Sequence, residues 1–149
     1  MSPFNAWVLL KVLQTLSLPV VRMSASALEL AGVLQAHRKV AWVIYPWLES
    51  HPQYGLALKQ MYGGGTVVTF EVVGGKDEAF AVMNALEIVD ISNNLGDAKL
   101  MITHPATTTH RRLGPRARLA VAITDGVRRV RVGLEDVRDL VEDFQRAPG

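Results

Sequence analysis

The sequence has no cysteine and few aromatic residues. Acidic residues are scarce in one long stretch near its C-terminus. Its 149 residues include no Cys, and 7% are Phe, Trp or Tyr. The lack of cysteine excludes a disulfide framework, a thiolate nucleophile and a Cys-ligated zinc site. It also suits a reducing compartment, so we expect a cytoplasmic protein.

One hydrophobic run near the N-terminus could be mistaken for a membrane span. Residues 3–21 come nearest, but Lys11 interrupts the middle of this stretch and Pro19 lies near its end. A signal peptide carries its positive charge ahead of the apolar stretch, and a span needs about 20 predominantly apolar residues. We therefore expect no membrane partner and interpret the stretch as a buried or interface helix.

Acidic residues are scarce between positions 111 and 131, where the sequence contains one acid, Asp125, and seven arginines (111, 112, 116, 118, 128, 129 and 131). Such a cluster could bind nucleic acid. However, no aromatic residue that could stack on a base lies between positions 81 and 143, and the predicted C-terminal helix is acidic at its start. We therefore expect no nucleic-acid partner.

The composition is that of one packed domain, with 49% hydrophobic and 20% charged residues. Periodicity and turn signals predict short strands and helices in rough alternation. The expected fold is α+β, a two-layer sandwich with a small mainly antiparallel sheet, helices on one side, and a long N-terminal linking helix. The predicted helices cover residues 3–17, 25–36, 50–61, 76–86, 116–121 and 135–146, and the predicted strands cover residues 40–45, 66–73, 88–92, 100–103 and 127–132.

The N-terminal helix is apolar on nearly every side. Trp7, Leu10, Leu13 and Leu16 recur at helical spacing, and other apolar residues lie between them. This is more apolar surface than one small domain covers, so we expect another domain or a second copy to pack on it, giving a homo-oligomer. Pro19 should break or bend the helix between Leu16 and Val20. The expected organisation is a linking helix over residues 1–35 and a domain over residues 36–149.

Arg129 is the residue that a purely structural role explains least well. In the strand 127–132, a period of two places Arg128 with Val130 and Arg129 with Arg131, on opposite faces. At least one arginine therefore points toward a core or a cleft, where a guanidinium needs an anionic partner. Its planar fork fits a substrate carboxylate. A solvated or salt-bridged surface arginine is the alternative.

Other candidate sites have weaker support. His104 and His110, with Asp97 as a third group, could bind a metal, but their spacing matches no zinc pattern, so we expect no metal site. Thr107 to Thr109 are expected to cap turns through their hydroxyls. The glycines at 63–65 precede a strand and therefore do not form a phosphate loop. No Ser-His-acid arrangement supports nucleophilic hydrolysis.

Several motifs, in order over nearly the whole chain, resemble the C-terminal part of the Cys/Met-metabolism family of pyridoxal phosphate (PLP) enzymes, especially its sulfhydrylases that act on succinylated homoserine. They are Ser2-Pro-Phe-Asn-Ala-Trp7, Ser50-His-Pro-Gln-Tyr54, Gly63-Gly-Gly-Thr-Val-Val-Thr-Phe70, Ile91-Ser-Asn-Asn-Leu-Gly-Asp-Ala-Lys99, Thr103-His-Pro-Ala-Thr-Thr-Thr-His110 and Val132-Gly-Leu-Glu-Asp-Val137.

The resemblance implies the small C-terminal domain of a PLP enzyme of fold type I. In the intact enzyme this domain would help to bind an activated homoserine while sulfide replaces the succinyl group. The family's cofactor lysine and phosphate-binding residues lie in a large domain that precedes this segment. None of the five lysines here (11, 39, 59, 76 and 99) matches that motif. We therefore expect no catalytic residue and no bound PLP in this chain alone. We expect its partner to be the large PLP-binding domain, which this segment does not contain.

The resemblance also assigns one role and several departures. The family's arginine for the substrate α-carboxylate lies four residues before the glycine of the Val-Gly-Leu-Glu-Asp motif, which gives Arg129.

Leu100 stands where a serine beside the substrate is common in the family, and Arg116 stands where an acid is usual. Arg128 and Arg131 replace an apolar and a small residue. Such departures fit a truncated, decayed or reused copy, or a distant branch. The rival hypothesis is a non-enzymatic interaction or self-associating domain.

Overall fold

The computed structural model describes residues 1–94 and 98–147, which form an α+β fold around one mixed five-stranded sheet. The strand order is β1-β2-β5-β4-β3, and neighbouring strands pair antiparallel except for the parallel pair β3 and β4. The expected antiparallel sheet therefore carries one parallel edge. The strands are β1 (Val40–Ile44), β2 (Val67–Val72), β3 (Asp90–Ile91), β4 (Met101–Thr103) and β5 (Val127–Arg131).

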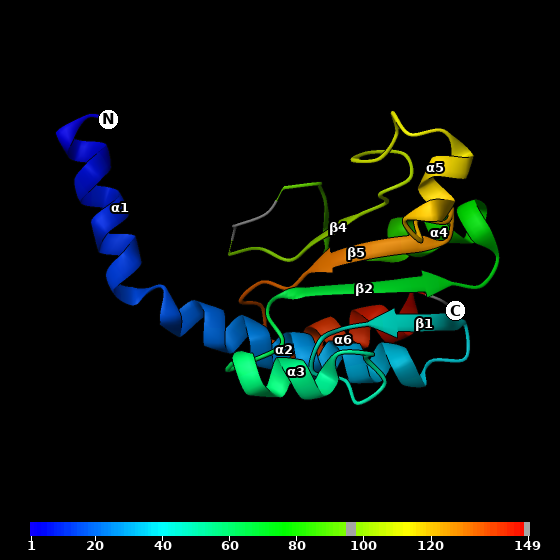
Figure 1. The fold of residues 1–149 in the computed structure, drawn as a ribbon, viewed down its shortest axis with the longest axis horizontal. Coiled ribbons are helices and arrows are strands. Elements are labelled where there is room, and N and C mark those ends of the chain that lie inside the picture. The colour runs from blue at the N-terminus through cyan, green and yellow to red at the C-terminus, as the bar shows by residue number, and fades with distance from the viewer. Residues whose placement is uncertain (95–97, 148–149) are drawn as a thin grey trace.

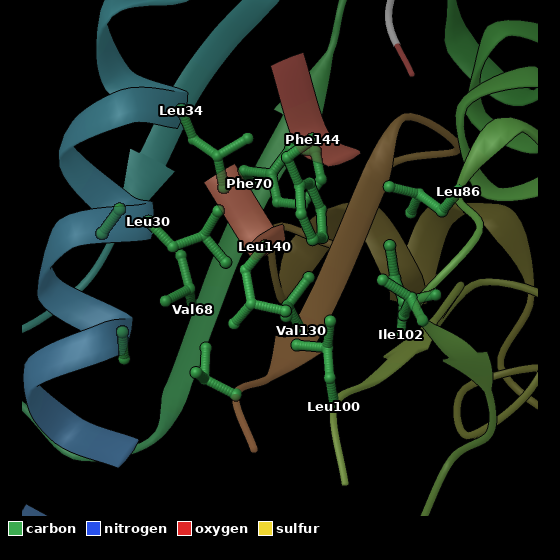
Figure 2. Packing of buried hydrophobic residues seen from close by; sticks show 14 of the residues in the cluster. Leu30, Leu34, Val68, Phe70, Leu86, Leu100, Ile102, Val130, Leu140 and Phe144 are labelled. Atoms are coloured by element: carbon green, nitrogen blue, oxygen red, sulfur yellow. The ribbon is translucent and has the colours of Figure 1, made fainter. Parts of the chain in front are cut away.

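The core lies on one face of this sheet. Strand β2 alternates strictly between buried and half-buried positions, and Val68 and Phe70 point into the core. Helices α2 (Ser17–Ala36), α4 (Gly75–Ala85) and α6 (Val137–Arg146) contribute the facing side chains (Figure 2). Phe144 of α6 packs edge-on against Phe70, with ring centroids 6.3 Å apart. The sheet positions between the buried ones, among them Thr69 and Arg129, belong to the opposite face, called the open face below.

Three elements differ in length from the sequence prediction by more than two residues. Helix α2 begins at residue 17 instead of residue 25, helix α3 (Tyr54–Gln60) begins at residue 54 instead of residue 50, and β3 has two residues instead of five. At β3 the reason is the carboxylate of Asp143, which is buried in α6. It accepts hydrogen bonds from the backbone N–H groups of Glu87 and Ile88, at 3.0 and 3.1 Å. These amides are thereby occupied before they can join a strand ladder.

The N-terminal helix is interrupted where Pro19 predicts. Helix α1 (Pro3–Thr15) begins with the Ser2 hydroxyl accepting from the N–H of Asn5, and Leu16 separates it from α2. Proline has no N–H, so Pro19 leaves the Thr15 carbonyl without its donor four residues on. No residue of α1 is buried, and the helix projects away from the sheet (Figure 1).

Within the described part of the chain, α2 alone has the length and apolar composition of a membrane span. Six of its residues are nevertheless buried in the protein, among them Leu30 and Leu34, which pack in the core beneath the sheet. This burial accounts for the apolar composition, because a core helix needs the same residues as a span.

Helix α5 (Pro115–Ala120) has no side-chain cap at its start, and a residue with strained backbone follows its end. Its N-cap is Gly114, with no side-chain hydrogen bond, and Arg116 lies in the first turn, where the helix dipole disfavours a cation. Ala122, two residues beyond the helix, has φ of 57°. An L-residue in this left-handed region costs roughly 1–2 kcal/mol, and glycine avoids most of that cost.

We therefore expect Ala122→Gly to raise the free energy of unfolding by about 1 kcal/mol, measured by urea denaturation. The matched control is Ala120→Gly, inside α5 with ordinary helical backbone, which should lower it by about 1 kcal/mol. Equal losses in both variants would show that the Ala122 backbone is not strained in solution.

Candidate functional site

Arg129 occupies the middle of the open face. In the strand register it lies between Thr69 of β2 and Thr103 of β4. Its side chain is half-buried, and Nη2 donates one long hydrogen bond of 3.5 Å to the carbonyl oxygen of Asn93. Among residues 1–94 and 98–147, no carboxylate lies within 4.0 Å of its guanidinium. The arginine therefore presents a reachable positive charge that no acid among the described residues neutralises.

Thr69 and Thr103 lie on either side of Arg129 on the open face, a placement that the sequence alone does not predict. Thr103 Oγ1 lies 2.9 Å from Thr108 Oγ1, and the Thr108 hydroxyl donates to the His104 carbonyl at 2.8 Å. These bonds hold the start of the loop after β4 beside Arg129. Only the strand register reveals this proximity, because Thr69 and Thr103 are 34 positions apart along the chain.

Glu71 is an acid on the same face, but other donors occupy it. It lies two positions along β2 from Thr69, diagonally across from Arg129 in the register. Its Oε2 accepts from the indole N–H of Trp42 and its Oε1 from the hydroxyl of Thr124. The carboxylate is thus held by a strand and a loop that lie on either side of β2. The carboxylate of Glu71 is therefore engaged by Trp42 and Thr124 and forms no ion pair with Arg129.

Arg131 shares the open face with Arg129 but has a structural role. It is 6% exposed, and its Nη1 donates to the carbonyl oxygen of Lys99 at 3.0 Å. Its Nη2 lies 3.8 Å from the sulfur of Met23 in α2. Arg131 therefore ties α2 to the chain just before β4, and it is far less accessible than Arg129.

Arg128 points to the core, as the alternation along β5 requires. It is fully buried: Nε donates to the Ala79 carbonyl at 3.0 Å, and Nη1 donates to the carbonyls of Gly126 and Val127. Burial lowers the pKa of Arg128 to about 10, although the negative charge of Glu71 opposes this shift. The cation is thus solvated by carbonyl oxygens in place of a carboxylate.

The seven arginines accordingly do not form one basic patch. Arg128 and Arg131 are buried, Arg118 forms an ion pair with Asp125 at 3.0 Å, and Arg129 is half-buried on the open face. The other three, Arg111, Arg112 and Arg116, are exposed in and beside the loop that leads to α5.

The side chain of Leu100 lies on the core face of the sheet and that of Arg129 on the open face, and the expectation that Leu100 stands beside the substrate stays a prediction. Its side chain is 1% exposed and packs in the core with Ile102 and Val130 (Figure 2). Alternation along β4 explains the placement, because Thr103 is on the open face and Leu100 is an odd number of residues away. Its backbone N–H donates to Oε1 of Glu135 at 2.7 Å.

The histidine loop has a structural explanation. His104 is buried, Nε2 donates to the Asp125 carbonyl at 2.9 Å, and Nδ1 accepts from the Thr107 hydroxyl at 2.8 Å. Burial lowers the pKa of His104, so the ring is neutral at pH 7. Both ring nitrogens are engaged within the protein, and the described residues contain no group of three potential metal ligands. Asp97, the third suggested ligand, lies outside the described residues.

The described lysines do not form a site for PLP. Lys39 pairs with Glu78 at 3.4 Å, Lys99 pairs with Asp90 at 3.2 Å, and Lys76 lies over the ring of Phe80. Lys11 and Lys59 are exposed on helices. A lysine that holds this cofactor must approach it from within a closed site, and these five side chains are spread over the surface.

One apolar cleft lies away from Arg129, between α2 and the segment after α3. It has a volume of about 430 Å³. One wall is the first half of α2, including Val21, Ala25 and Leu28, and the other includes Trp47 and Tyr62. Its lining contains no charged residue, so it suits an apolar occupant.

The sequence profile of the Cys/Met metabolism PLP-dependent enzymes matches residues 1–148. The chain is 56% identical over 151 aligned residues to an O-succinylhomoserine sulfhydrylase of Mycobacterium tuberculosis, covering 99% of this chain and 37% of the relative. It is 49% identical to the Pseudomonas aeruginosa enzyme of the same name, covering 98% of this chain and 36% of that protein. An L-methionine gamma-lyase of Pseudomonas deceptionensis is 40% identical, with 99% and 37% covered. The chain thus spans little more than a third of these relatives.

Solved structures agree with this relationship. A crystal structure described as an O-acetylhomoserine (thiol)-lyase from Campylobacter jejuni, which carries a pyridoxyl-lysine monophosphate, superposes with a TM-score of 0.93 at 31% identity. It covers 99% of this chain and 35% of that chain. A cystathionine gamma synthase from Xanthomonas oryzae, in complex with aminoacrylate and cysteine, superposes with a TM-score of 0.91 at 33% identity. The match covers 99% of this chain and 38% of that chain.

Proposed function

The chain belongs to the Cys/Met metabolism family of PLP-dependent enzymes, and from this membership we propose that it is the part of such an enzyme that holds the carboxylate of an amino-acid substrate. The observation that carries the proposal is Arg129. It is central on the open face, partly accessible, and without a carboxylate partner among the described residues.

The chemistry of Arg129 fits this role. A guanidinium offers two parallel N–H groups to the two oxygens of a carboxylate, which fixes the orientation as well as the position of the substrate. The long bond to the Asn93 carbonyl is weak enough to be exchanged for such a contact. Strand pairing on both sides of β5 holds the arginine backbone rigidly, so little ordering is needed when the substrate binds.

The proposed substrate is O-succinylhomoserine, with sulfide as the second reactant and homocysteine and succinate as products. Support comes from the names of the two relatives at 56% and 49% identity. Methionine gamma-lyases also resemble the chain at about 40% identity, so the substrate is tested against methionine below.

We propose that the lysine and the phosphate-binding groups for PLP belong to the remaining two-thirds of the larger protein. Support comes from the share of the relatives that the chain covers and from the positions of its own lysines. When bound, PLP supplies an electron sink for the substrate's carbon atoms. The two-layer arrangement of sheet and helices, the division near residue 36 and a cytoplasmic location are parts of the same proposal.

A second candidate function is an interaction domain without catalysis. The specific observation in its favour is α1, a helix with large apolar side chains and no buried residue. In a complete enzyme the large domain would cover this helix, whereas in an interaction domain a protein partner would do so.

The test is a chimera in which this chain replaces the matching segment of the M. tuberculosis sulfhydrylase. We expect the purified, PLP-loaded chimera to form homocysteine from O-succinylhomoserine and sulfide, because all missing parts are supplied. Faster release of methanethiol from methionine would assign the chain to the lyases instead. A folded, PLP-loaded chimera that is inactive on both substrates would contradict the enzymatic proposal and favour the interaction domain.

A further inference from the structure

Glu135 lies in the turn between β5 and α6 and binds the backbone at the start of β4. Its Oε1 accepts the N–H of Leu100 at 2.7 Å, a short distance that is typical of a charged acceptor. Beside this bond, the N–H of Leu134 donates to the Ala98 carbonyl at 2.8 Å. Glu135 belongs to the Val-Gly-Leu-Glu-Asp motif, and the proposed role of Arg129 gives this acid no function.

Gly133 allows the turn to approach the start of β4 this closely. A Cβ at position 133 would lie 2.5 Å from the carbonyl oxygen of Ala98 and still closer to the backbone nitrogen of Leu100. Both distances are far shorter than van der Waals contact, so only glycine fits here. The contact is therefore built into the backbone of the two segments and does not depend on a flexible side chain alone.

The strand that Glu135 holds places Thr103 beside Arg129. Strand β4 has three residues and pairs antiparallel with β5, and Thr103 lies opposite Arg129 in the register. A strand this short forms few ladder hydrogen bonds, so its position depends strongly on the contacts at its ends. The bond from Leu100 to Glu135 is such a contact, immediately before the first residue of β4.

The same segment also places the carbonyl oxygen that Arg129 contacts. The N–H of Asp90 in β3 donates to the Leu100 carbonyl at 3.2 Å, and β3 runs parallel to β4. Two residues after β3, the Asn93 carbonyl accepts from Nη2 of Arg129 at 3.5 Å. Backbone hydrogen bonds thus connect Glu135 to both of the groups that border the guanidinium on this side.

We propose that Glu135 is a positioning residue for the substrate carboxylate, because it fixes the backbone on which the surroundings of Arg129 depend. The inference rests on the proposed function of Arg129 and extends it to an acid in another part of the chain. Without the bond to Leu100, β4 and the end of β3 would be free to shift along β5. Thr103 and the Asn93 carbonyl would then no longer hold the guanidinium in one orientation.

Stability alone gives little reason for a carboxylate at this position. Oε2 of Glu135 is buried and has no hydrogen-bond partner among the described residues. A buried charged oxygen without a partner costs free energy, and glutamine would offer Leu100 an acceptor without that charge. A charged acceptor forms the stronger hydrogen bond, however. The carboxylate therefore favours a firm hold on the backbone of Leu100 over maximal stability.

The test measures the binding of substrate analogues to the PLP-loaded chimera through the absorbance of PLP. Glu135→Ala should raise the dissociation constant for an analogue with a free α-carboxylate about tenfold, within the about 100-fold that a displacement of about 1 Å can cost. Affinity for the same analogue with an α-amide should change little, because the amide does not use the guanidinium fork. Glu135→Gln should restore most of the affinity, since its side-chain carbonyl accepts the same N–H.

Asp136→Ala is the matched control. The Asp136 carboxylate caps α6 by accepting the N–H of Arg138 at 2.9 Å, so its loss should lower the urea midpoint. It should leave the affinity for both analogues unchanged. If Glu135→Ala does not fold, Glu135→Asp replaces it, because a carboxylate one CH₂ shorter keeps the acid but does not reach Leu100.

Three results would overturn the inference: unchanged affinity in the folded Glu135→Ala or Glu135→Asp chimera, equal losses for the carboxylate and amide analogues, or the same loss in Asp136→Ala. The Arg129→Ala chimera separates this failure from that of the proposed function. If Arg129→Ala weakens binding and the Glu135 variants do not, only the positioning role is wrong. If Arg129→Ala also leaves affinity unchanged, the proposed function and the inference fail together.

Discussion

Replacing Arg129 with alanine in the PLP-loaded chimera is expected to raise the dissociation constant for the amino-acid substrate by about 10- to 150-fold. A hydrogen bond to a charged group contributes roughly 1.5–3 kcal/mol, and each 1.4 kcal/mol is a factor of ten in affinity. The effect should be this large because the described residues offer the substrate carboxylate no second unpaired cation on the open face. Binding would be followed through the absorbance of PLP as substrate is added.

Three variants act as controls for this prediction. Arg129→Lys keeps the charge but loses the bidentate fork, so it should restore part of the affinity. Arg131→Ala should weaken binding less, because that guanidinium is bonded to the Lys99 carbonyl. Arg112→Ala removes an exposed arginine in the loop and should have no effect. An Arg129→Ala chimera with unchanged affinity would show that the family role does not apply to this chain.

The largest expected effect on stability is that of Arg128→Ala. Its side chain is the bulkiest of the fully buried ones in the described part of the chain, and its removal leaves a cavity beside Ala79 and α4. Truncation of large core side chains costs about 3–5 kcal/mol, a large share of the about 5–15 kcal/mol that stabilises a domain. Urea denaturation should therefore show a much lower midpoint for this variant.

Arg128→Met distinguishes the volume of the side chain from its charge. Methionine fills similar space and removes a buried cation whose solvation by carbonyls is incomplete, since Nη2 has no hydrogen-bond partner among the described residues. We expect Arg128→Met to cost at most about 1 kcal/mol. If methionine destabilises the protein as much as alanine does, the hydrogen bonds to Gly126 and Val127 matter more than packing.

The sequence predicted those parts of the fold that depend on local chemistry. Alternation along β5 separated Arg128 from Arg129 correctly, and Pro19 predicted the break that occurs at Leu16. The start of β3 was not predictable, because it depends on Asp143, which is more than 50 residues away in the sequence. Local patterns carry no information about such a partner.

The candidate site was predicted only in part, for a similar reason. The period of two did not show which face of β5 would be covered by helices, so either Arg128 or Arg129 could have been the buried arginine. The threonines beside Arg129 depend on strand register, which is set by packing across the whole sheet. The resemblance gave the position of Leu100 in the sequence but not the direction of its side chain, which packs in the core.

A thermodynamic cycle on the chimera tests the central claim most directly. It compares dissociation constants for a substrate analogue with a free α-carboxylate and for the same analogue with that group converted to an amide, each measured on the chimera with Arg129 intact and on its Arg129→Ala variant. If Arg129 binds the carboxylate, each single change should weaken binding by about 10- to 150-fold, and the second change should add little to the first. If the two changes weaken binding independently, so that their effects multiply, the carboxylate is held elsewhere and the proposed role of Arg129 is wrong.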